Sequence, residues 1–151
     1  MNIASILARK GDKVVTVRPE DTIRQALARL AEHNIGALVV LDATGAPVGI
    51  LSERDVVRRA AQDEEVFALR VGDLMTRDVI LGQPHDDLES VSRTMVERRI
   101  RHLPVMDRGR LVGIVSIGDV VKTQRDQYQG EVDTLQFQIL DTPTVKSPSP
   151  R

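Results

Sequence analysis

The sequence predicts a mixed fold of the α/β (α+β) class, made of two copies of one β-α-β-β-α unit. First, aliphatic runs of strand length, such as residues 36–42 and 111–116, alternate with segments of helical period, such as residues 22–33. Second, the two halves of the chain repeat each other. Third, hydrophobic residues make up 41% of the chain but aromatic residues only 2%. The core between the helices and strands must therefore be aliphatic.

The internal repeat is the most informative feature of the sequence. Fifteen residues are identical between the halves at an offset of 65 residues, which becomes 64 after a turn near Gly45. The clearest copies are the pattern glycine–apolar–x–Ser–x–x–Asp at residues 49–55 and 113–119. One such unit would expose an apolar sheet face. We therefore expect two units to bury these faces together about a pseudo-twofold axis.

Each unit is expected to begin with a short strand that a proline ends, Pro19 in the first unit and Pro84 in the second. A capped helix, a hairpin with a glycine-containing turn and a second helix follow. In the first unit these elements are expected at residues 14–17, 22–33, 37–41, 48–51 and from Asp55 onward. In the second unit they are expected at residues 79–81, 88–95, 102–106, 111–115 and from Asp119 onward.

The repeat divides the chain into four parts, which are residues 1–67, 68–125, 126–140 and 141–151. The first part is a repeat with an N-terminal lead-in, and the second part is the other repeat. The third is a C-terminal helix, and the fourth is a Pro/Ser-rich tail predicted to be disordered. The VGDLMT stretch between the repeats predicts a short helical lead-in, whose Leu74 and Met75 pack like Ile6 and Leu7 before the first repeat.

Apolar residues also recur along the C-terminal helix at spacings close to those of a coiled-coil seam. They are Val121, Tyr128, Val132, Leu135 and Ile139. Gly130 interrupts the helix at a cost of about 1 kcal/mol. Two arrangements fit this pattern: the helix packs on its own domain, or it packs on a second subunit.

Composition excludes several classes of function. The net charge is −1 and Phe67, Tyr128 and Phe137 are the only aromatic residues, which disfavours a nucleic-acid partner. There is no cysteine, and the histidines lack metal-ligand spacing, so we expect neither a metal site nor a thiol nucleophile. Ser52 and Ser116 lie in no nucleophile-elbow pattern, so no catalytic residue is expected. No apolar run resembles a signal peptide or a membrane span, and a cytoplasmic protein is expected.

The repeated motifs resemble those of a pair of CBS domains, the tandem arrangement called a Bateman module. The resemblance covers residues 14–123 and rests on VGDLMT, on NIGALVV with RIRHLPV, and on GILSERD with GIVSIGD. The whole chain is similar to the bacterial stand-alone CBS-pair proteins. The resemblance implies a cleft between the repeats that binds an adenine nucleotide, AMP first and ATP or NAD as alternatives. It implies no reaction and no required cofactor, and it implies a homodimer, because the family commonly stacks two pairs into a flat disk.

In this family each nucleotide pocket takes residues from both repeats. Carried onto this sequence, the resemblance builds a first pocket from Ile50, Ser52, Arg54, Asp55, Ile80, Arg101 and His102. It builds a second pocket from Ile114, Ser116, Asp119, Val15, Gly36 and Ala37. An aspartate can accept both hydroxyls of a ribose, while a serine hydroxyl and helix N-terminal amides suit phosphate oxygens. An apolar residue beside them can cover a purine face.

The residues themselves leave a plainer interpretation open, in which Ser52 and Asp55 only cap a helix and Arg54 and Arg101 are solvated or paired with acidic residues. The two pockets also differ in charge. The second pocket lacks the basic residues of the first, and each charge-assisted hydrogen bond to phosphate contributes roughly 1.5–3 kcal/mol. Two missing cations correspond to a loss on the order of 100-fold in affinity. We therefore hypothesise that the first pocket binds nucleotide tightly and the second weakly or not at all.

Three functions compete at this point. The leading hypothesis is a non-catalytic regulatory module that senses an adenine nucleotide in signal transduction. The second is a ligand-free structural module for dimerisation or interaction. The third is an enzyme related to IMP dehydrogenase, which carries such a pair, but the 151 residues leave no room for a barrel of about 250 residues. No residue pattern identifies a downstream protein partner.

Overall fold

The computed structural model describes residues 1–11 and 13–140, and it confirms the α+β fold of two related repeats. The first repeat contains β1 (Thr16–Val17), α2 (Ile23–His33), β2 (Ala37–Leu41), β3 (Pro47–Ser52) and α3 (Glu53–Ala60). The second contains α5 (Leu88–Arg98), β4 (His102–Asp107), β5 (Arg110–Ser116) and α6 (Ile117–Leu140). Three short helices complete the described chain, α1 (Ile3–Lys10), the 3₁₀ turn η1 (Val66–Ala68) and α4 (Val71–Leu74).

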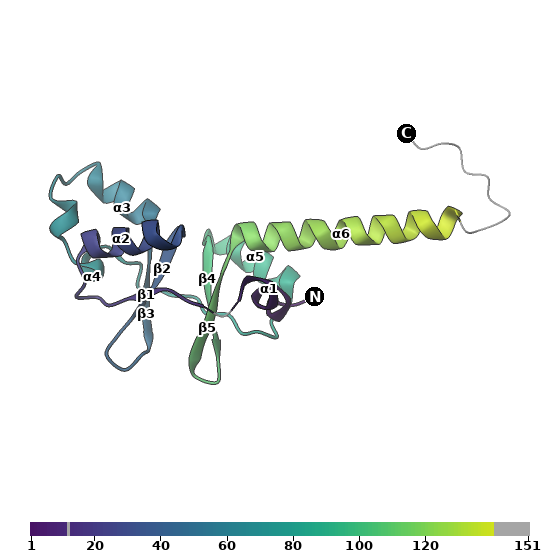
Figure 1. Cartoon of the computed structure of the whole chain (residues 1–151), viewed down its shortest axis with the longest axis horizontal. Helices are drawn as coiled ribbons and strands as arrows, with labels where there is room; N and C mark the ends of the chain where they lie inside the picture. Colours follow the sequence, from purple (N-terminus) through teal and green to yellow (C-terminus); the bar gives the residue numbers. More distant parts are fainter. Residues whose placement is uncertain (12, 141–151) are drawn as a thin grey trace.

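Two small sheets lie in the middle of the molecule, with helices at both ends (Figure 1). In the first sheet β1 runs parallel to β2, and β2 pairs antiparallel with β3. In the second sheet β4 and β5 form an antiparallel hairpin. The helices α2, α3 and α4 lie at one end, and α1, α5 and the start of α6 lie at the other (Figure 1). The carboxyl ends of β3 and β5 each lead directly into a helix, which is where the sequence places its repeated motif.

The strand predicted over residues 79–81 does not form, so this part of the prediction is wrong. Thr76 pairs with Ile50 of the first sheet through two backbone hydrogen bonds of 2.9 and 3.0 Å. Six residues later, Gly82 makes an isolated bridge to β4 of the second sheet. Residues 77–81 therefore cross from one sheet to the other, and they form no strand with either. A glycine suits the position where the chain reaches the second sheet, because a Cβ on Gly82 would lie 2.7 Å from the side chain of Leu103.

The predicted helix caps are confirmed in both repeats. Thr22 caps α2 by accepting a hydrogen bond from the backbone N–H of Gln25, and Asp87 caps α5 in the same way toward Ser90. Both helices end on a left-handed residue at the same point of the repeat, Asn34 with φ 52° and Arg99 with φ 55°. The duplicated sequence therefore produces the same local structure twice.

The two lead-in helices are exchanged between the repeats. Helix α1, which precedes the first repeat in the chain, buries Ile3 and Ile6 in the core of the second repeat. Helix α4, which precedes the second repeat, buries Val71 in the core of the first, and Met75 directly after α4 is buried there too. Each hydrophobic core is therefore completed by a segment that the chain supplies next to the other repeat.

The C-terminal helix is a direct continuation of the second helix of the repeat. Helix α6 runs without interruption from Ile117 through Gly130 to Leu140 and extends well beyond the rest of the body (Figure 1). The tail predicted to be disordered, residues 141–151, lies outside the described residues. Within the described part of the chain, no helix has both the length and the apolar character that a membrane span requires.

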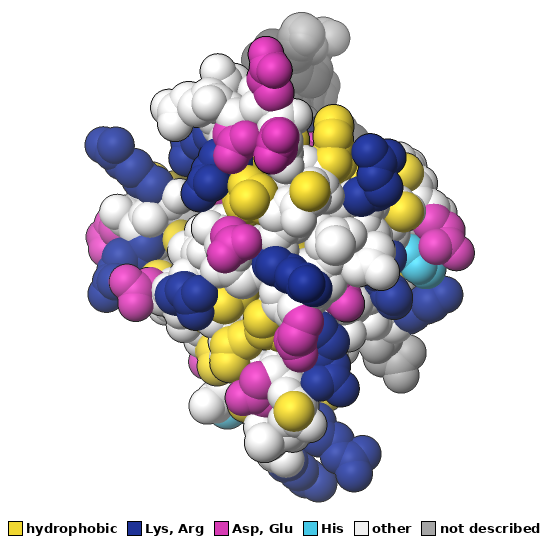
Figure 2. Space-filling view, turned by 90° about the vertical axis from the view of Figure 1, so that its left-hand side faces the viewer, with side chains coloured by type: hydrophobic (Ala, Val, Ile, Leu, Met, Phe, Trp, Pro, Cys, Tyr) yellow, Lys and Arg dark blue, Asp and Glu magenta, His cyan; other side chains and the backbone are white. Residues whose placement is uncertain are grey.

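The end of the molecule formed by α2, α3 and α4 carries charged side chains of both signs (Figure 2). Hydrophobic side chains lie in small groups between them. Phe67 is one of the exposed apolar residues of the first repeat, and the guanidinium of Arg24 lies 5.2 Å from its ring centroid. Such a cation–π contact covers part of an aromatic face without a partner protein.

The packing of α1 yields the first prediction. Ile6 is 2% exposed in the core of the second repeat, so Ile6→Ala should lower the free energy of unfolding by about 2–5 kcal/mol. Urea denaturation followed by circular dichroism measures this loss. Ala8→Ser, at an exposed position of the same helix, is the matched control. Equal stability of the two variants would show that α1 does not contribute to the second core.

Candidate functional site

A cleft of about 490 Å³ opens between the two repeats. All seven residues predicted for the first pocket line it, which are Ile50, Ser52, Arg54, Asp55, Ile80, Arg101 and His102. The first four come from β3 and α3 of one repeat, and the last three come from the crossing segment, the residue before β4 and the first residue of β4. The structure thus brings together, in one cavity, residues that are up to 52 positions apart in the chain.

Equivalent residues of the two repeats hold equivalent positions beside the helices. The carbonyl of Gly36 accepts a hydrogen bond from the N–H of Glu53 at the start of α3, at 3.0 Å. The carbonyl of Arg101 accepts one from the N–H of Ile117 at the start of α6, at 2.8 Å. A glycine in one repeat therefore takes the place of an arginine in the other, as the sequence alignment of the repeats predicts.

Ser52 and Asp55 form a capping box at the N-terminus of α3. The Asp55 carboxylate accepts hydrogen bonds from the Ser52 N–H at 2.9 Å and from its hydroxyl at 3.1 Å, both through Oδ2. The Ser52 hydroxyl oxygen accepts a longer bond from the Asp55 N–H at 3.3 Å. The capping interpretation of these residues is therefore correct, and it is compatible with their place on the cleft wall, because both side chains are only half-buried.

Positive charge dominates the wall of the cleft. Five arginines line it, namely Arg54, Arg58, Arg98, Arg99 and Arg101, against three acidic residues, Glu53, Asp55 and Asp78. The five arginines are exposed at their outer parts, so a ligand can reach them from solvent. Their number within one cavity suits a ligand with several negative charges.

Some lining residues were missed by the sequence reasoning. Arg98 and Arg99 lie at the end of α5, Thr76 pairs with the first sheet, and Asp78 and Val79 belong to the crossing segment. The basic run of residues 98–101 carried a signal for the two arginines, since a helix end directly before β4 must lie beside Arg101. No local signal pointed to the crossing segment, because its position depends on pairing with both sheets.

His102 is the titratable group of the cleft with the clearest perturbation. Burial lowers its pKa below the ordinary histidine value, and the positive charges of Lys10 and Arg101 lower it further. Asp119 and Glu53 act in the opposite direction but do not outweigh these effects. At neutral pH His102 is therefore a neutral imidazole, and the positive charge of the first pocket comes from its arginines rather than from this histidine.

The residues predicted for the second pocket are not gathered in the same way. Gly36 lines the first cleft, and Ala37 is 4% exposed in β2. Asp119 lines a separate cavity of about 180 Å³, whose other walls are Ile6, Arg9, Lys10, Lys122 and Thr123. Ser116 and Asp119 repeat the capping geometry of the first pocket, with bonds of 2.8 and 3.0 Å between backbone and side chain.

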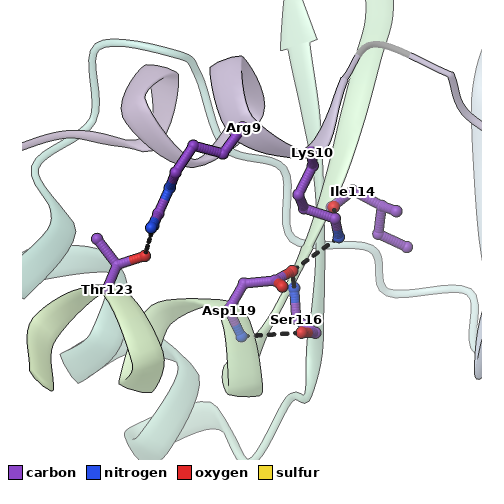
Figure 3. A network of polar contacts seen from close by, with 6 residues as sticks. All are labelled: Arg9, Lys10, Ile114, Ser116, Asp119 and Thr123. Atoms are coloured by element: carbon purple, nitrogen blue, oxygen red, sulfur yellow. Dashed lines mark hydrogen bonds and ion pairs between the residues drawn. The ribbon is translucent and has the colours of Figure 1, made fainter. Parts of the chain in front are cut away.

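A lysine from α1 distinguishes the two aspartates. Lys10 Nζ lies 2.7 Å from Asp119 Oδ2 and forms an ion pair with it (Figure 3). Burial acts to raise the pKa of Asp119, but hydrogen bonds from Lys10 and Ser116 and the charge of Lys10 lower it below the usual value. Asp119 is therefore held as a carboxylate by a partner within its own chain.

The family of the chain follows from this repeated architecture and from its sequence. A sequence profile described as "CBS domain" matches the chain twice, over residues 4–62 and 71–126. The chain belongs to the CBS-domain family. Its CBS pair is 35% identical over 112 residues to the CBS domain-containing protein YhcV of Bacillus subtilis, a match that covers 74% of this chain and 79% of that protein.

Solved structures share the architecture of this CBS pair. The CBS-domain containing protein ATU1752 from Agrobacterium tumefaciens matches with a TM-score of 0.78 and 42% sequence identity, over 82% of this chain and 99% of that chain. The CBS domain pair of protein MJ0100 was solved in complex with 5-methylthioadenosine and S-adenosyl-L-methionine. It matches with a TM-score of 0.75 and 27% identity, over 84% of this chain and 98% of that chain.

The lowered pKa of His102 yields the second prediction. The unfolded chain takes up a proton near the ordinary histidine pKa of about 6.5, whereas the folded CBS pair does so only at lower pH. The stability that neutral His102 contributes should therefore be fully present above about pH 6.5. It should be lost as the pH falls toward the lower pKa of the folded state. Denaturation midpoints in urea between pH 8 and pH 5.5 measure the effect.

Two histidine variants test this prediction, one at His102 and one as a control. In His102→Gln the fall in midpoint below pH 6.5 should be shallower than in the wild type. In His85→Gln, at an exposed position outside the cleft, the wild-type slope should remain. The same slope in His102→Gln and wild type would contradict the assignment.

Proposed function

We propose that this CBS pair is a non-catalytic regulatory module that binds one adenine nucleotide in the cleft between its repeats. AMP is the first candidate ligand, and ATP and NAD are the alternatives. The observation that supports this proposal most strongly is the single cleft lined by Asp55, three isoleucines and five arginines. Its volume of about 490 Å³ falls within the range of about 300–1,000 Å³ that small-molecule sites occupy.

Each part of the nucleotide has a matching group in the cleft. The Asp55 carboxylate is assigned to the ribose hydroxyls, since a carboxylate has acceptor sites left beyond its capping bonds. Ile50 and Ile80, from opposite repeats, are assigned to the two faces of the adenine ring. Arg101 is assigned to the phosphate, together with the N-terminal end of α3.

Nucleotide binding across the cleft would change how the two repeats are arranged relative to each other. Asp55 belongs to the first repeat and Arg101 to the second, so one ligand that contacts both side chains favours a closed arrangement of the two. A ligand shifts such an equilibrium only by its difference in affinity for the open and closed states. The adenosine-containing ligands of the MJ0100 pair support an adenosine-type ligand here. We assign no reaction to the cleft.

The third prediction separates the phosphate contact from the ribose contact. Arg101→Ala should weaken AMP binding by roughly 10- to 100-fold, since one charge-assisted hydrogen bond contributes about 1.5–3 kcal/mol. The same variant should leave adenosine binding unchanged. Asp55→Asn, which keeps an oxygen for the helix cap, should weaken AMP and adenosine alike. Isothermal titration calorimetry with both ligands measures these differences.

A matched control and a ligand screen complete this test. Arg110→Ala, at an exposed position of β5 that does not line the cleft, should bind AMP like the wild type. A thermal shift with AMP, ATP, NAD and S-adenosylmethionine ranks the ligands, because a ligand at 100 times its Kd stabilises the folded state by about 2.7 kcal/mol. No shift with any of the four would refute the nucleotide proposal and favour a ligand-free module.

We also propose that the protein forms a homodimer through α6. The exposed apolar face of this helix is the observation that favours an interaction role. Val121, Tyr128, Leu135 and Ile139 are 47–67% exposed, although they are apolar and recur at coiled-coil spacing. The partner with matching spacing is a second copy of this helix. The positions flanking the seam between Tyr128 and Ile139 are Gln129, Glu131, Gln136 and Gln138. Glu131 would face a glutamine in a parallel pair, so these four flanking positions bring no like charges together.

The fourth prediction tests this surface. Replacing Val132 and Leu135 together by glutamate should place four carboxylates in the seam of the pair and convert the dimer into a monomer. Size-exclusion chromatography with light scattering measures the mass. Gln127→Glu, which adds a charge on the opposite face of α6, should leave the dimer intact. A dimeric mass in the double variant would show that α6 is not the interface.

A further inference from the structure

The place predicted for a second nucleotide already contains a polar side chain of the protein itself. Lys10 Nζ donates hydrogen bonds to Asp119 Oδ2 at 2.7 Å and to the carbonyl oxygen of Ile114 at 2.9 Å (Figure 3). Asp119 and Ile114 correspond to Asp55 and Ile50, the residues assigned to ribose and adenine in the first cleft. The ammonium group therefore uses the oxygen acceptors where a second ribose would bind.

Helix α1 holds this lysine firmly in place. Ile3 and Ile6 of α1 are buried in the core of the second repeat, and Leu7 packs against Gly113 of β5 so closely that a Cβ on the glycine would collide with it. In the last turn, Arg9 donates a hydrogen bond to Thr123 and lies 3.7 Å from Asp126 of α6. A cation fixed in this way competes with a free ligand at an advantage, because it loses no translational or rotational freedom on binding.

The first cleft has an acidic residue at the equivalent point. Met75 contacts Gly49 as Leu7 contacts Gly113, so these two pairs define the correspondence between α4 and α1. Three residues beyond Leu7 is Lys10, and three residues beyond Met75 is Asp78. Asp78 lines the first cleft but has the same charge as Asp55 and cannot neutralise it. With Asp78 at this point, Asp55 remains available to a ligand. With Lys10 there instead, Asp119 is engaged in an ion pair.

The sizes of the two cavities agree with this difference. The first cleft has about 490 Å³, whereas the cavity that Lys10 and Asp119 share has about 180 Å³. Small-molecule sites usually have about 300–1,000 Å³, so the smaller cavity has no room for a nucleotide while Lys10 stays in place.

We propose that Lys10 is a built-in occupant of the second pocket, which competes with nucleotide for Asp119 and limits this CBS pair to one bound adenine nucleotide per chain. The inference rests on the proposed nucleotide site in the first cleft. Lys10 lies outside both repeated motifs. Its effect adds to that of Gly36, which stands in the second pocket where the first has Arg101, and both lower the affinity of the second pocket for nucleotide.

Calorimetric titration with AMP tests this role. The wild type should bind one equivalent per chain, and Lys10→Met should bind two, with the first affinity unchanged. The double variant Lys10→Met with Asp119→Asn should return to one equivalent, because the second ribose contact is weakened. Lys10→Gln, which keeps the length and polarity of the side chain, should also bind two equivalents. Circular dichroism confirms that each variant is folded.

The controls separate this inference from the proposed function. Lys13→Met removes an exposed lysine from the segment between α1 and β1, and this variant should bind one equivalent of AMP per chain. One equivalent in the wild type and in both Lys10 variants would overturn the role of Lys10 and leave the nucleotide site intact. Two equivalents in the wild type would also overturn it, since Lys10 would then not exclude the ligand. No binding in any of the proteins would overturn both proposals.

Discussion

The exchange of lead-in helices is the packing constraint on which the cleft depends. Leu7 fits against Gly113 and Met75 fits against Gly49, where a Cβ would lie 2.5 Å from the methionine sulfur. Each glycine allows a lead-in segment to approach a strand that a larger residue would hold away. Because each core needs a helix from the other side of its repeat, neither repeat is complete alone. The two halves are thereby tied to each other, and the cleft lies where they meet.

The repeated Ser–Asp pair serves the fold and the site together. In both repeats the carboxylate closes a capping box at the start of a helix, which orients the side chain at the end of a strand. This local bond explains why the same residue types recur even where the surroundings differ. The difference lies in the third partner, since Asp119 pairs with Lys10 while Asp55 faces a cleft rich in arginine. The chemistry of each site is therefore decided by the residues around the duplicated motif.

Much of this structure could be predicted from the sequence because its signals are local and occur twice. The hairpins and the caps follow from alternation, turn glycines and the repeated motif, whereas the residues of the first pocket were expected from the resemblance to CBS domains. The crossing segment could not be predicted in this way. Val79 to Leu81 have the composition of a strand, but they lie between a bridge to the first sheet and a bridge to the second and form no strand themselves. The position of Lys10 was equally inaccessible, because it depends on α1 folding against the second repeat rather than the first.

Helix α6 joins two distant parts of the molecule without a flexible joint. Its first turn carries Asp119 and its exposed apolar face continues to Ile139, all within one helix of 24 residues. At 1.5 Å per residue such a helix is about 36 Å long. A tilt of about 5° at Asp119 would therefore displace the far tip by roughly 3 Å. Any tilt at the base of α6 would thus cause a larger displacement at the opposite end of the helix.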